Sequence, residues 1–286
     1  MRARRAGVLA AEALINDRRG VVVSVHARAL NLLLDDGPLV SVLPAESPLH
    51  PWAVTAELAP RDLDRVAVGA VVRAADGRLE VGPLAVALAG LDVVDLRLSR
   101  RPAVFPAAAL RALARTASPP RAPGPFEPAL ARALERFRAG GPAVALAALV
   151  GVGEGLTPSG DDVIVGVLAA LDAARDCAPR AAAVRARLGA ALGAGGARTT
   201  RVAAQMLDAA IAGLYAEPLR DLLHALVPAR PVPARPGSRR ARSAEPAPAR
   251  LSRAVAAVLA IGHRSGGDTL RGLIAALERL RSPASP

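Results

Sequence analysis

The fold of this chain depends on two similar stretches, SGDDVIVGVLAAL at residues 159–171 and SGGDTLRGLIAAL at residues 265–277. Aligned without gaps, both contain Ser-Gly-x-Asp, a Gly four residues after that Asp, and a final Ala-Ala-Leu. Where the two differ at Ile164 and Leu270, and at Val167 and Leu273, both residues are apolar, which predicts a loop followed by a packed helix in each. We expect two units of the same design, related by a local two-fold axis.

The Ser and Asp residues of these stretches are open to a purely structural interpretation. Ser159 with Asp162, and Ser265 with Asp268, have the spacing of a capping box. In that motif the Ser side chain accepts from a backbone N–H of the first turn, and the acid reaches back. An Asp near a helix N-terminus is also favoured by the helix dipole. Capping alone accounts for these four residues as well as a binding site does.

Capping does not explain the glycines of the predicted first turns. Gly160, Gly266 and Gly267 would each destabilise a helix by roughly 0.5–1 kcal/mol relative to Ala. We expect them to expose backbone N–H groups, which at a helix N-terminus bind phosphate or carboxylate. Gly166 and Gly272 lie one turn further on, where the missing side chain predicts a close crossing of two helices.

The approach to the first helix reads GVGEGLTPSGDD over residues 151–162. It lacks the Lys of a Walker P-loop, and its helical surroundings exclude a Rossmann fold. Asp161 and Asp162 beside a bound phosphate would favour a cation between them, so Mg²⁺ is a candidate cofactor. Solvated caps are the alternative. The residues expected to bind ligand in the two loops are Gly153, Gly155, Thr157, Ser159, Gly160, Ser265, Gly266 and Gly267.

Two further segments carry side chains suited to a site for an anion. His263 precedes the second stretch and is the best-placed residue for acid–base chemistry, although it could instead bond a helix C-terminal carbonyl. Arg198, Thr199 and Thr200 precede another predicted helix, where they suit an anion clamp or an exposed cap. The candidate catalytic residues are Asp161, Asp162, His263 and Asp268.

The chain predicts an α+β fold with two domains. Residues 1–105 contain short apolar runs separated by turn formers, including the hairpin signal Asp76-Gly77, and predict a mostly-β barrel or sandwich. Residues 106–286 have helical periodicity and predict an all-helical domain that carries the Gly-rich loops. A Pro/Arg-rich insert near residues 228–248 predicts a disordered loop.

Composition disfavours several classes of function. The formal net charge is +12, but every basic residue is Arg and no aromatic residues are interleaved with them, so nucleic-acid binding is not expected. The single cysteine excludes an internal disulfide and fits a reducing compartment. No apolar run approaches the ~20 residues of a membrane span. We therefore expect a cytoplasmic protein.

The loop GVGEGLTPSGDD followed by an apolar helix resembles the signature of a bacterial family that includes the H-type subunit of oxamate carbamoyltransferase. RALN at residues 28–31 resembles its N-terminal strand motif, and RTT at 198–200 and GHRSGGDTLRG at 262–272 resemble its later motifs, in the same order. The resemblance covers most of the chain, apart from the Pro/Arg-rich insert.

The resemblance implies an enzyme subunit of purine (allantoin) catabolism. The implied reaction is phosphorolysis of oxalurate to oxamate and carbamoyl phosphate, carried out with other carbamoyltransferase subunits. Phosphate, carbamoyl phosphate or oxalurate would bind to residues 151–162, to Arg198, Thr199 and Thr200, and to the loop from His263 to Asp268. The alternative is a non-catalytic subunit that uses the same loops to bind or sense a small anion. A third hypothesis is a structural partner in which the repeated loops only end helices.

Overall fold

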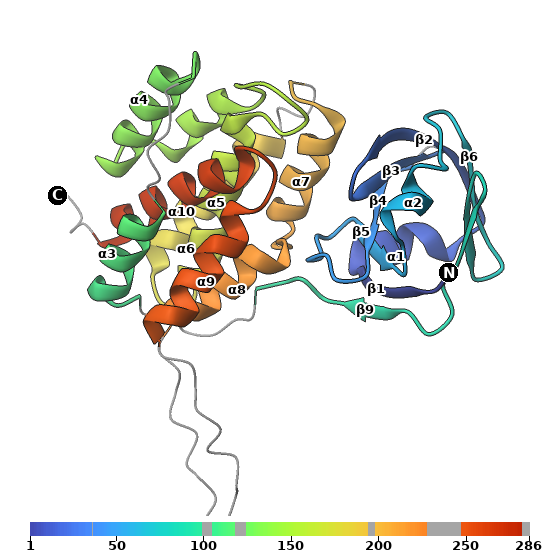
Figure 1. Ribbon diagram of the computed structural model, residues 1–286. Coiled ribbons are helices and arrows are strands. Elements are labelled where there is room, and N and C mark those ends of the chain that lie inside the picture. Colours follow the sequence, from blue (N-terminus) through green and yellow to red (C-terminus); the bar gives the residue numbers. More distant parts are fainter. Residues whose placement is uncertain (36, 99–104, 118–123, 194–197, 228–246, 282–286) are drawn as a thin grey trace, which may run out of the picture. The chain divides into compact units, whose positions relative to one another are not determined.

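The computed structural model describes the chain except residues 36, 99–104, 118–123, 194–197, 228–246 and 282–286 (Figure 1). It forms two compact units. The first, called the N-terminal unit, comprises Met1–Arg97 with Leu214–Glu217, and the second, called the helical unit, comprises Leu98–Gly213 with Pro218–Pro286. The expected α+β organisation, with a mostly-β part followed by a helical part, is confirmed.

The N-terminal unit is a single curled sheet that forms a half-barrel (Figure 1). Its strand order is β8-β7-β6-β2-β3-β4-β5-β1-β9. Most neighbours are antiparallel, whereas β4 pairs with β5 and β1 pairs with β9 in parallel. The strands are β1 (Ala3–Gly7), β2 (Arg18–His26), β3 (Ala29–Leu34), β4 (Leu39–Pro44), β5 (Ala53–Ala56), β6 (Val71–Ala75), β7 (Arg78–Val81), β8 (Leu84–Ala87) and β9 (Asp92–Val94).

Alternating apolar residues produce the concave core of this sheet. In β3 the inward positions Leu30, Leu32 and Leu34 are fully buried, while the residues between them are partly exposed. Helices α1 (Val8–Ile15) and α2 (Pro60–Leu63) complete the unit. The expected hairpin at Asp76-Gly77 is confirmed, because both residues have positive φ, as a tight two-residue turn between β6 and β7 requires.

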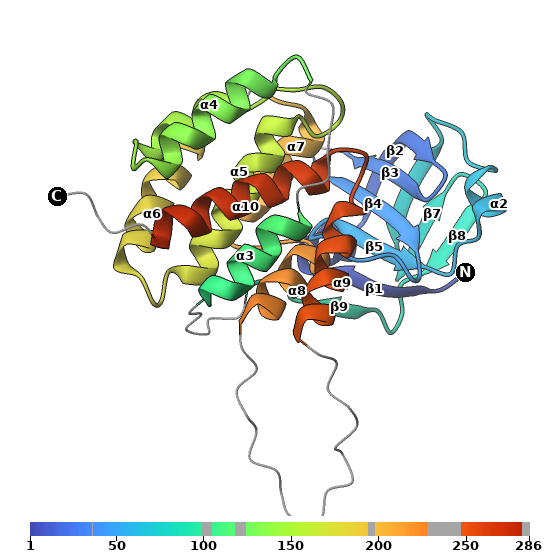
Figure 2. The ribbon, with the colours of Figure 1, turned by 60° about the vertical axis from the view of Figure 1, so that its left-hand side comes forward.

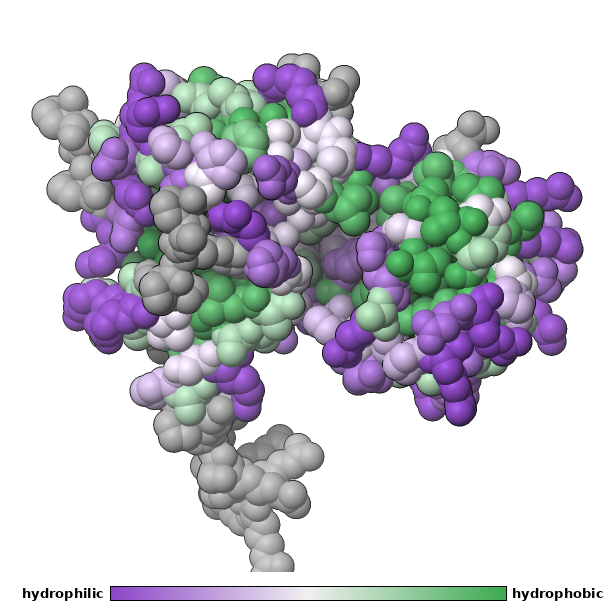
Figure 3. Space-filling view, turned by 45° about the horizontal axis from the view of Figure 1, so that its top comes forward, coloured by the Kyte–Doolittle hydropathy of each residue, from purple (hydrophilic) through white to green (hydrophobic). Residues whose placement is uncertain are grey.

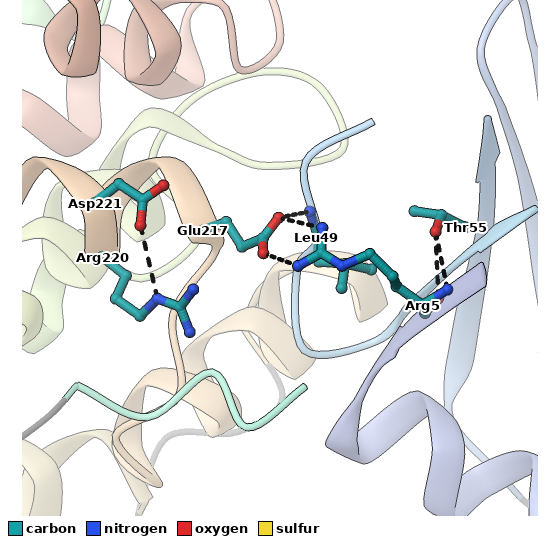
Figure 4. A network of polar contacts seen from close by, with 6 residues as sticks. All are labelled: Arg5, Leu49, Thr55, Glu217, Arg220 and Asp221. Atoms are coloured by element: carbon teal, nitrogen blue, oxygen red, sulfur yellow. Dashed lines mark hydrogen bonds and ion pairs between the residues drawn. The ribbon is translucent and has the colours of Figure 1, made fainter. Parts of the chain in front are cut away.

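A short segment from the second half of the chain, Leu214–Glu217, also belongs to the N-terminal unit. Tyr215 donates its backbone N–H to Leu96, and Glu217 accepts from the Leu49 backbone N–H and from the Arg5 guanidinium (Figure 4). The Glu217 side chain is only 13% exposed, and the Arg5 guanidinium compensates its partly buried charge. The spacing of Val202, Met206 and Leu214 predicts one face of a helix, but Leu214 instead forms an isolated antiparallel bridge with Arg97.

Helix α5 forms the centre of the helical unit. All of its residues except Ser159 and Ala173 are buried, because it is apolar on every side and neighbours surround it. Helix α10 lies across it (Figure 2). The elements are α3 (Ala107–Thr116), α4 (Glu127–Arg138), the 3-10 helix η1 (Ala143–Leu149), α5 (Ser159–Ala174), α6 (Pro179–Gly193), α7 (Arg201–Ile211), α8 (Glu217–Leu226), α9 (Ala247–Leu259) and α10 (Ser265–Arg281).

The crossing of α5 and α10 depends on one glycine from each helix. A Cβ at Gly166 would lie 1.9 Å from the Thr269 carbonyl oxygen, and a Cβ at Gly272 would lie 1.9 Å from the Val163 carbonyl oxygen. These four residues are equivalent in pairs in the two sequence stretches, so the contacts are reciprocal, as a local two-fold axis requires. The expected close crossing is confirmed.

Two details of the helical prediction are wrong. The α5 helix has Pro158 as its N-cap, so Ser159 lies inside the first turn and forms no capping box with Asp162. The buried face of α7 contains Ala203, Leu207 and Ala210, one position away from the predicted face. The predicted disordered insert lies mostly outside the described residues, but its last residues, 247 and 248, begin α9.

None of the helices within the described residues has the length and apolar character needed to cross a membrane.

Replacing Gly272 or Gly166 by Ala will destabilise the helical unit, because the new methyl group meets a backbone carbonyl that cannot move aside. We expect a loss of about 3 kcal/mol or more in the free energy of unfolding, measured by urea denaturation. Gly193→Ala in α6 is the matched control, since its Cβ would meet nothing within 4 Å. That control should change stability by less than about 1 kcal/mol. Equal effects at all three positions would contradict the close crossing.

Candidate functional site

Gly160 and Gly266 allow the starts of α5 and α10 to pack closely against neighbouring backbone, and their amides are not exposed. A Cβ at Gly160 would lie 2.0 Å from the Leu149 carbonyl oxygen, and one at Gly266 would lie 1.9 Å from that of Val258. Their N–H groups donate to Val152 and Ile261. The expectation of free amides at these two glycines is therefore wrong. In each repeat, the start of the helix packs against the backbone of the helical segment before it, and the amide is hydrogen-bonded.

The loop that precedes α5 turns through three glycines with positive φ. Gly151 and Gly153 adopt φ of 77° and 133°, and both approach backbone closely, at the Arg198 carbonyl and the Ser159 amide. Gly155 also has positive φ, of 87°, but is exposed with open space where a Cβ would stand. The first two glycines therefore shape the loop, and Gly155 is the one at its open surface.

Asp161 holds this loop in place. It is 2% exposed, accepts the Gly151 backbone N–H at 3.2 Å, and accepts the Thr199 hydroxyl at 2.7 Å. Burial raises the pKa of the Asp161 carboxyl, and the hydrogen bonds from Thr199 and Gly151 act in the opposite direction. These contacts assign Asp161 to loop support.

The Arg-Thr-Thr segment at residues 198–200 contacts the same loop. The Arg198 guanidinium donates to the Ala147 carbonyl at 3.0 Å. Thr200 is the N-cap of α7, where its hydroxyl accepts from the Ala203 amide at 3.1 Å and also donates to the Leu156 carbonyl. Together with Thr199, these residues connect α7 and η1 to the Gly-rich loop.

The two repeated loops meet through their hydroxyl groups. The hydroxyl oxygens of Thr157, from the first loop, and Ser265, from the start of α10, lie 2.7 Å apart. Both also hydrogen-bond the carboxyl group of Asp162. Residues more than a hundred positions apart in the sequence therefore form one composite site.

Asp162 and Asp268 are the buried acids of this composite site. They occupy equivalent positions in the two repeats and are 3% and 4% exposed. Burial raises the pKa of the Asp162 carboxyl to about 8, and the charges of Asp268 and Asp161 add to that rise, while hydrogen bonds from Ser265 and Thr157 oppose it. The raised pKa favours the neutral form of Asp162, which can donate a proton.

Both acids also have an oxygen that is not satisfied within the described part of the chain. The Oδ2 atoms of Asp162 and Asp268 are buried and have no hydrogen-bond partner there. Buried oxygens of this kind are destabilising unless a water or a ligand donates to them. The two unsatisfied oxygens therefore mark the part of the site that is best suited to hydrogen-bond polar groups of a ligand.

Other candidates lie around this centre. His263 is exposed in the turn before α10, and Gly267 is partly exposed in the first turn of α10. Sequence reasoning missed Arg271, whose guanidinium lies 3.5 Å from Asp268 and also pairs with Glu127 of α4 at 2.8 Å. Its position three residues after Asp268 on a helix was the signal that could have identified it.

The described residues contain no group of three or more His, Cys, Asp or Glu side chains arranged to hold a metal ion. The oxygens of Asp161 bond Gly151 and Thr199, whereas Asp162 and Asp268 each have one buried carboxyl oxygen that the described residues leave unsatisfied. The Mg²⁺ hypothesis stays a prediction, to be tested by adding the ion.

Asp162→Asn will change how stability depends on pH. Because the native pKa of about 8 exceeds the ordinary value of 3.8, the native state binds the extra proton between these values, and its stability falls as pH rises through that window. The Asn variant cannot ionise at this position. Between these two pH values it should therefore lose less free energy of unfolding than the wild type, by on the order of a few kcal/mol. Thermal and urea unfolding across this pH range, with the exposed Asp17→Asn as control, measures the difference. Parallel curves for wild type and Asp162→Asn would show that Asp162 has an ordinary pKa.

Comparison with family models gives two matches. Residues 149–277 match the model described as oxamate carbamoyltransferase subunit AllH, and residues 3–93 match the AllH family N-terminal domain. None of the curated proteins or solved structures matches the chain. The first match contains the whole composite site, and the second spans almost all of the curled sheet. This chain belongs to the AllH family, whose description is that of a subunit of oxamate carbamoyltransferase.

Proposed function

We propose that this chain contributes a binding site for a small phosphorylated or carboxylate ligand to an oxamate carbamoyltransferase. In the proposed reaction, oxalurate and phosphate give oxamate and carbamoyl phosphate, as a step of allantoin catabolism. The observation that carries the proposal is the hydrogen bond between Thr157 and Ser265, which joins both repeated loops above the buried Asp162. Membership in the AllH family supports the reaction class.

In the proposed reaction, an oxygen of phosphate attacks the carbamoyl carbon of oxalurate and the C–N bond to the oxamate nitrogen breaks. That nitrogen then takes up one proton, and the proton that the attacking hydrogen phosphate releases restores the group that supplied it. Asp162 is suited to supply it, since its pKa of about 8 leaves the carboxyl protonated at neutral pH. The proton would pass through the Thr157 or Ser265 hydroxyl, each of which bonds Asp162.

Recognition of the ligand is divided between two kinds of group. Arg198 and His263 are exposed beside the loops and suit a phosphate or carboxylate. The unsatisfied oxygen of Asp268 suits an N–H donor, which the carbamoyl and ureido groups of the substrate provide, and the protonated carboxyl of Asp162 can donate to an oxygen of the ligand. This arrangement favours catalysis by positioning and by charge stabilisation, without a covalent nucleophile.

A thermal-shift titration of the chain with phosphate, carbamoyl phosphate and oxalurate, with and without Mg²⁺, tests the site. Binding should stabilise the protein as RT ln(1 + [L]/Kd), about 2.7 kcal/mol at a hundredfold excess over Kd. Thr157→Val removes the hydroxyl that faces Ser265 and should weaken binding about tenfold, the loss expected for one hydrogen bond. Thr116→Val, on the exposed end of α3, should have no effect.

An assay of oxalurate phosphorolysis by the chain together with its partner subunits then distinguishes a catalytic subunit from a regulatory one. Turnover that Asp162→Asn reduces would support a catalytic subunit. Binding of carbamoyl phosphate with unchanged turnover in that variant would favour a regulatory subunit. Binding of none of the three ligands, alone or with partners, would contradict both.

A further inference from the structure

One outward face of the curled sheet is apolar where the alternation of its strands would place polar residues. In β2 and β6 the inward positions are buried, and the outward positions include Val21 and Val71, which pair directly across the strands. Val21 also pairs with the partly exposed Leu33 of β3 on its other side. A continuous apolar row therefore crosses three strands on the outside of the sheet.

Two further valines widen this row into a patch. Val23 lies where the register between β2 and β3 shifts. Val68 lies in the turn before β6, which is held against β2 by a hydrogen bond from the Gly69 amide to the Val22 carbonyl at 2.8 Å. We call Val21, Val23, Val68 and Val71 the valine patch.

The valine patch concentrates the exposed apolar surface of the molecule. Its members are 37–69% exposed, and they are four of the ten large apolar side chains that are exposed among the described residues. Figure 3 shows a broad hydrophobic area on the N-terminal unit with hydrophilic surface around it. Contiguous apolar surface with a polar rim is characteristic of a protein interface.

Arginine dominates the neighbouring row of the same face. Arg19 of β2 and Arg73 of β6 are exposed cross-strand partners, two residues along from Val21 and Val71. Neither forms an ion pair with any residue in the described part of the chain. Glu80 of β7 pairs with Arg73 in the register of the sheet and is the acid in this row. The patch therefore presents apolar surface with a mainly positive border.

We propose that the valine patch binds another subunit of the carbamoyltransferase, through an apolar surface of that subunit bordered by Asp or Glu. This inference rests on the proposed function, because it takes the partner from the same enzyme. A second copy of this chain fits less well, since a two-fold contact would set the Arg19 and Arg73 border against itself. An acidic border on the partner subunit would instead complement Arg19 and Arg73.

The test uses the full chain co-expressed with the other subunits of the same organism's enzyme, with Kd measured by calorimetry. The double variant Val21→Thr, Val71→Thr keeps the β-branched shape at exposed positions and should bind about tenfold more weakly at unchanged Tm. Val93→Thr, at an exposed valine of β9 outside the patch, is the matched control and should bind as wild type. Arg19→Gln with Arg73→Gln should weaken binding and reduce its dependence on salt.

Each other outcome would overturn the proposal in a distinguishable way. Wild-type binding that survives in the valine variant would exclude the patch and leave the proposed function standing. Self-association of the wild type in sedimentation, lost in the valine variant, would make a second copy the occupant. Absence of wild-type binding to these subunits would overturn both this inference and the partner part of the proposed function, whereas ligand binding would still be judged by thermal shift.

Discussion

The close crossing of α5 and α10 is the constraint on which the rest of the helical unit depends. Gly166 and Gly272 let each helix backbone approach a carbonyl of the other, and no side chain larger than hydrogen fits there. The same sequence pattern contains Gly160 and Gly266, which let each helix pack closely against the backbone of the segment before it. Backbone packing at these four positions therefore fixes where both helices begin.

The crossing explains why one site arises from two distant loops. A two-fold arrangement of the helix pair puts equivalent N-termini on the same side, so Thr157 meets Ser265 and both contact Asp162. Burial of Asp162 with Asp268 then raises the pKa of Asp162, and a neutral acid results without any change of residue type. Asp161, although adjacent in sequence, points to Gly151 and Thr199 and supports the loop.

Local signals predicted much of this structure, and long-range contacts account for what they missed. The Asp76-Gly77 turn, the β-rich first part and the glycine crossing follow from spacing and composition. Strands β1 and β5 have no clear local signal, because ARRAG and AVTA are short and Ala-rich, and β5 is buried on both faces. The role of Gly160 depends on Leu149, and the place of Leu214 depends on the pairing of its neighbour Tyr215 with Leu96. Such partners are not encoded in the local pattern.

The central claim is that Asp162 and Asp268 lie together in one composite site. The most direct measurement is an NMR titration of the Asp162 carboxyl carbon in the full chain and in Asp268→Asn. We predict that Asp162 titrates near pH 8 in the wild type and at a lower pH in the variant, because one neighbouring negative charge is removed. Titration of Asp162 near pH 4, or a midpoint that Asp268→Asn leaves unchanged, would contradict the account.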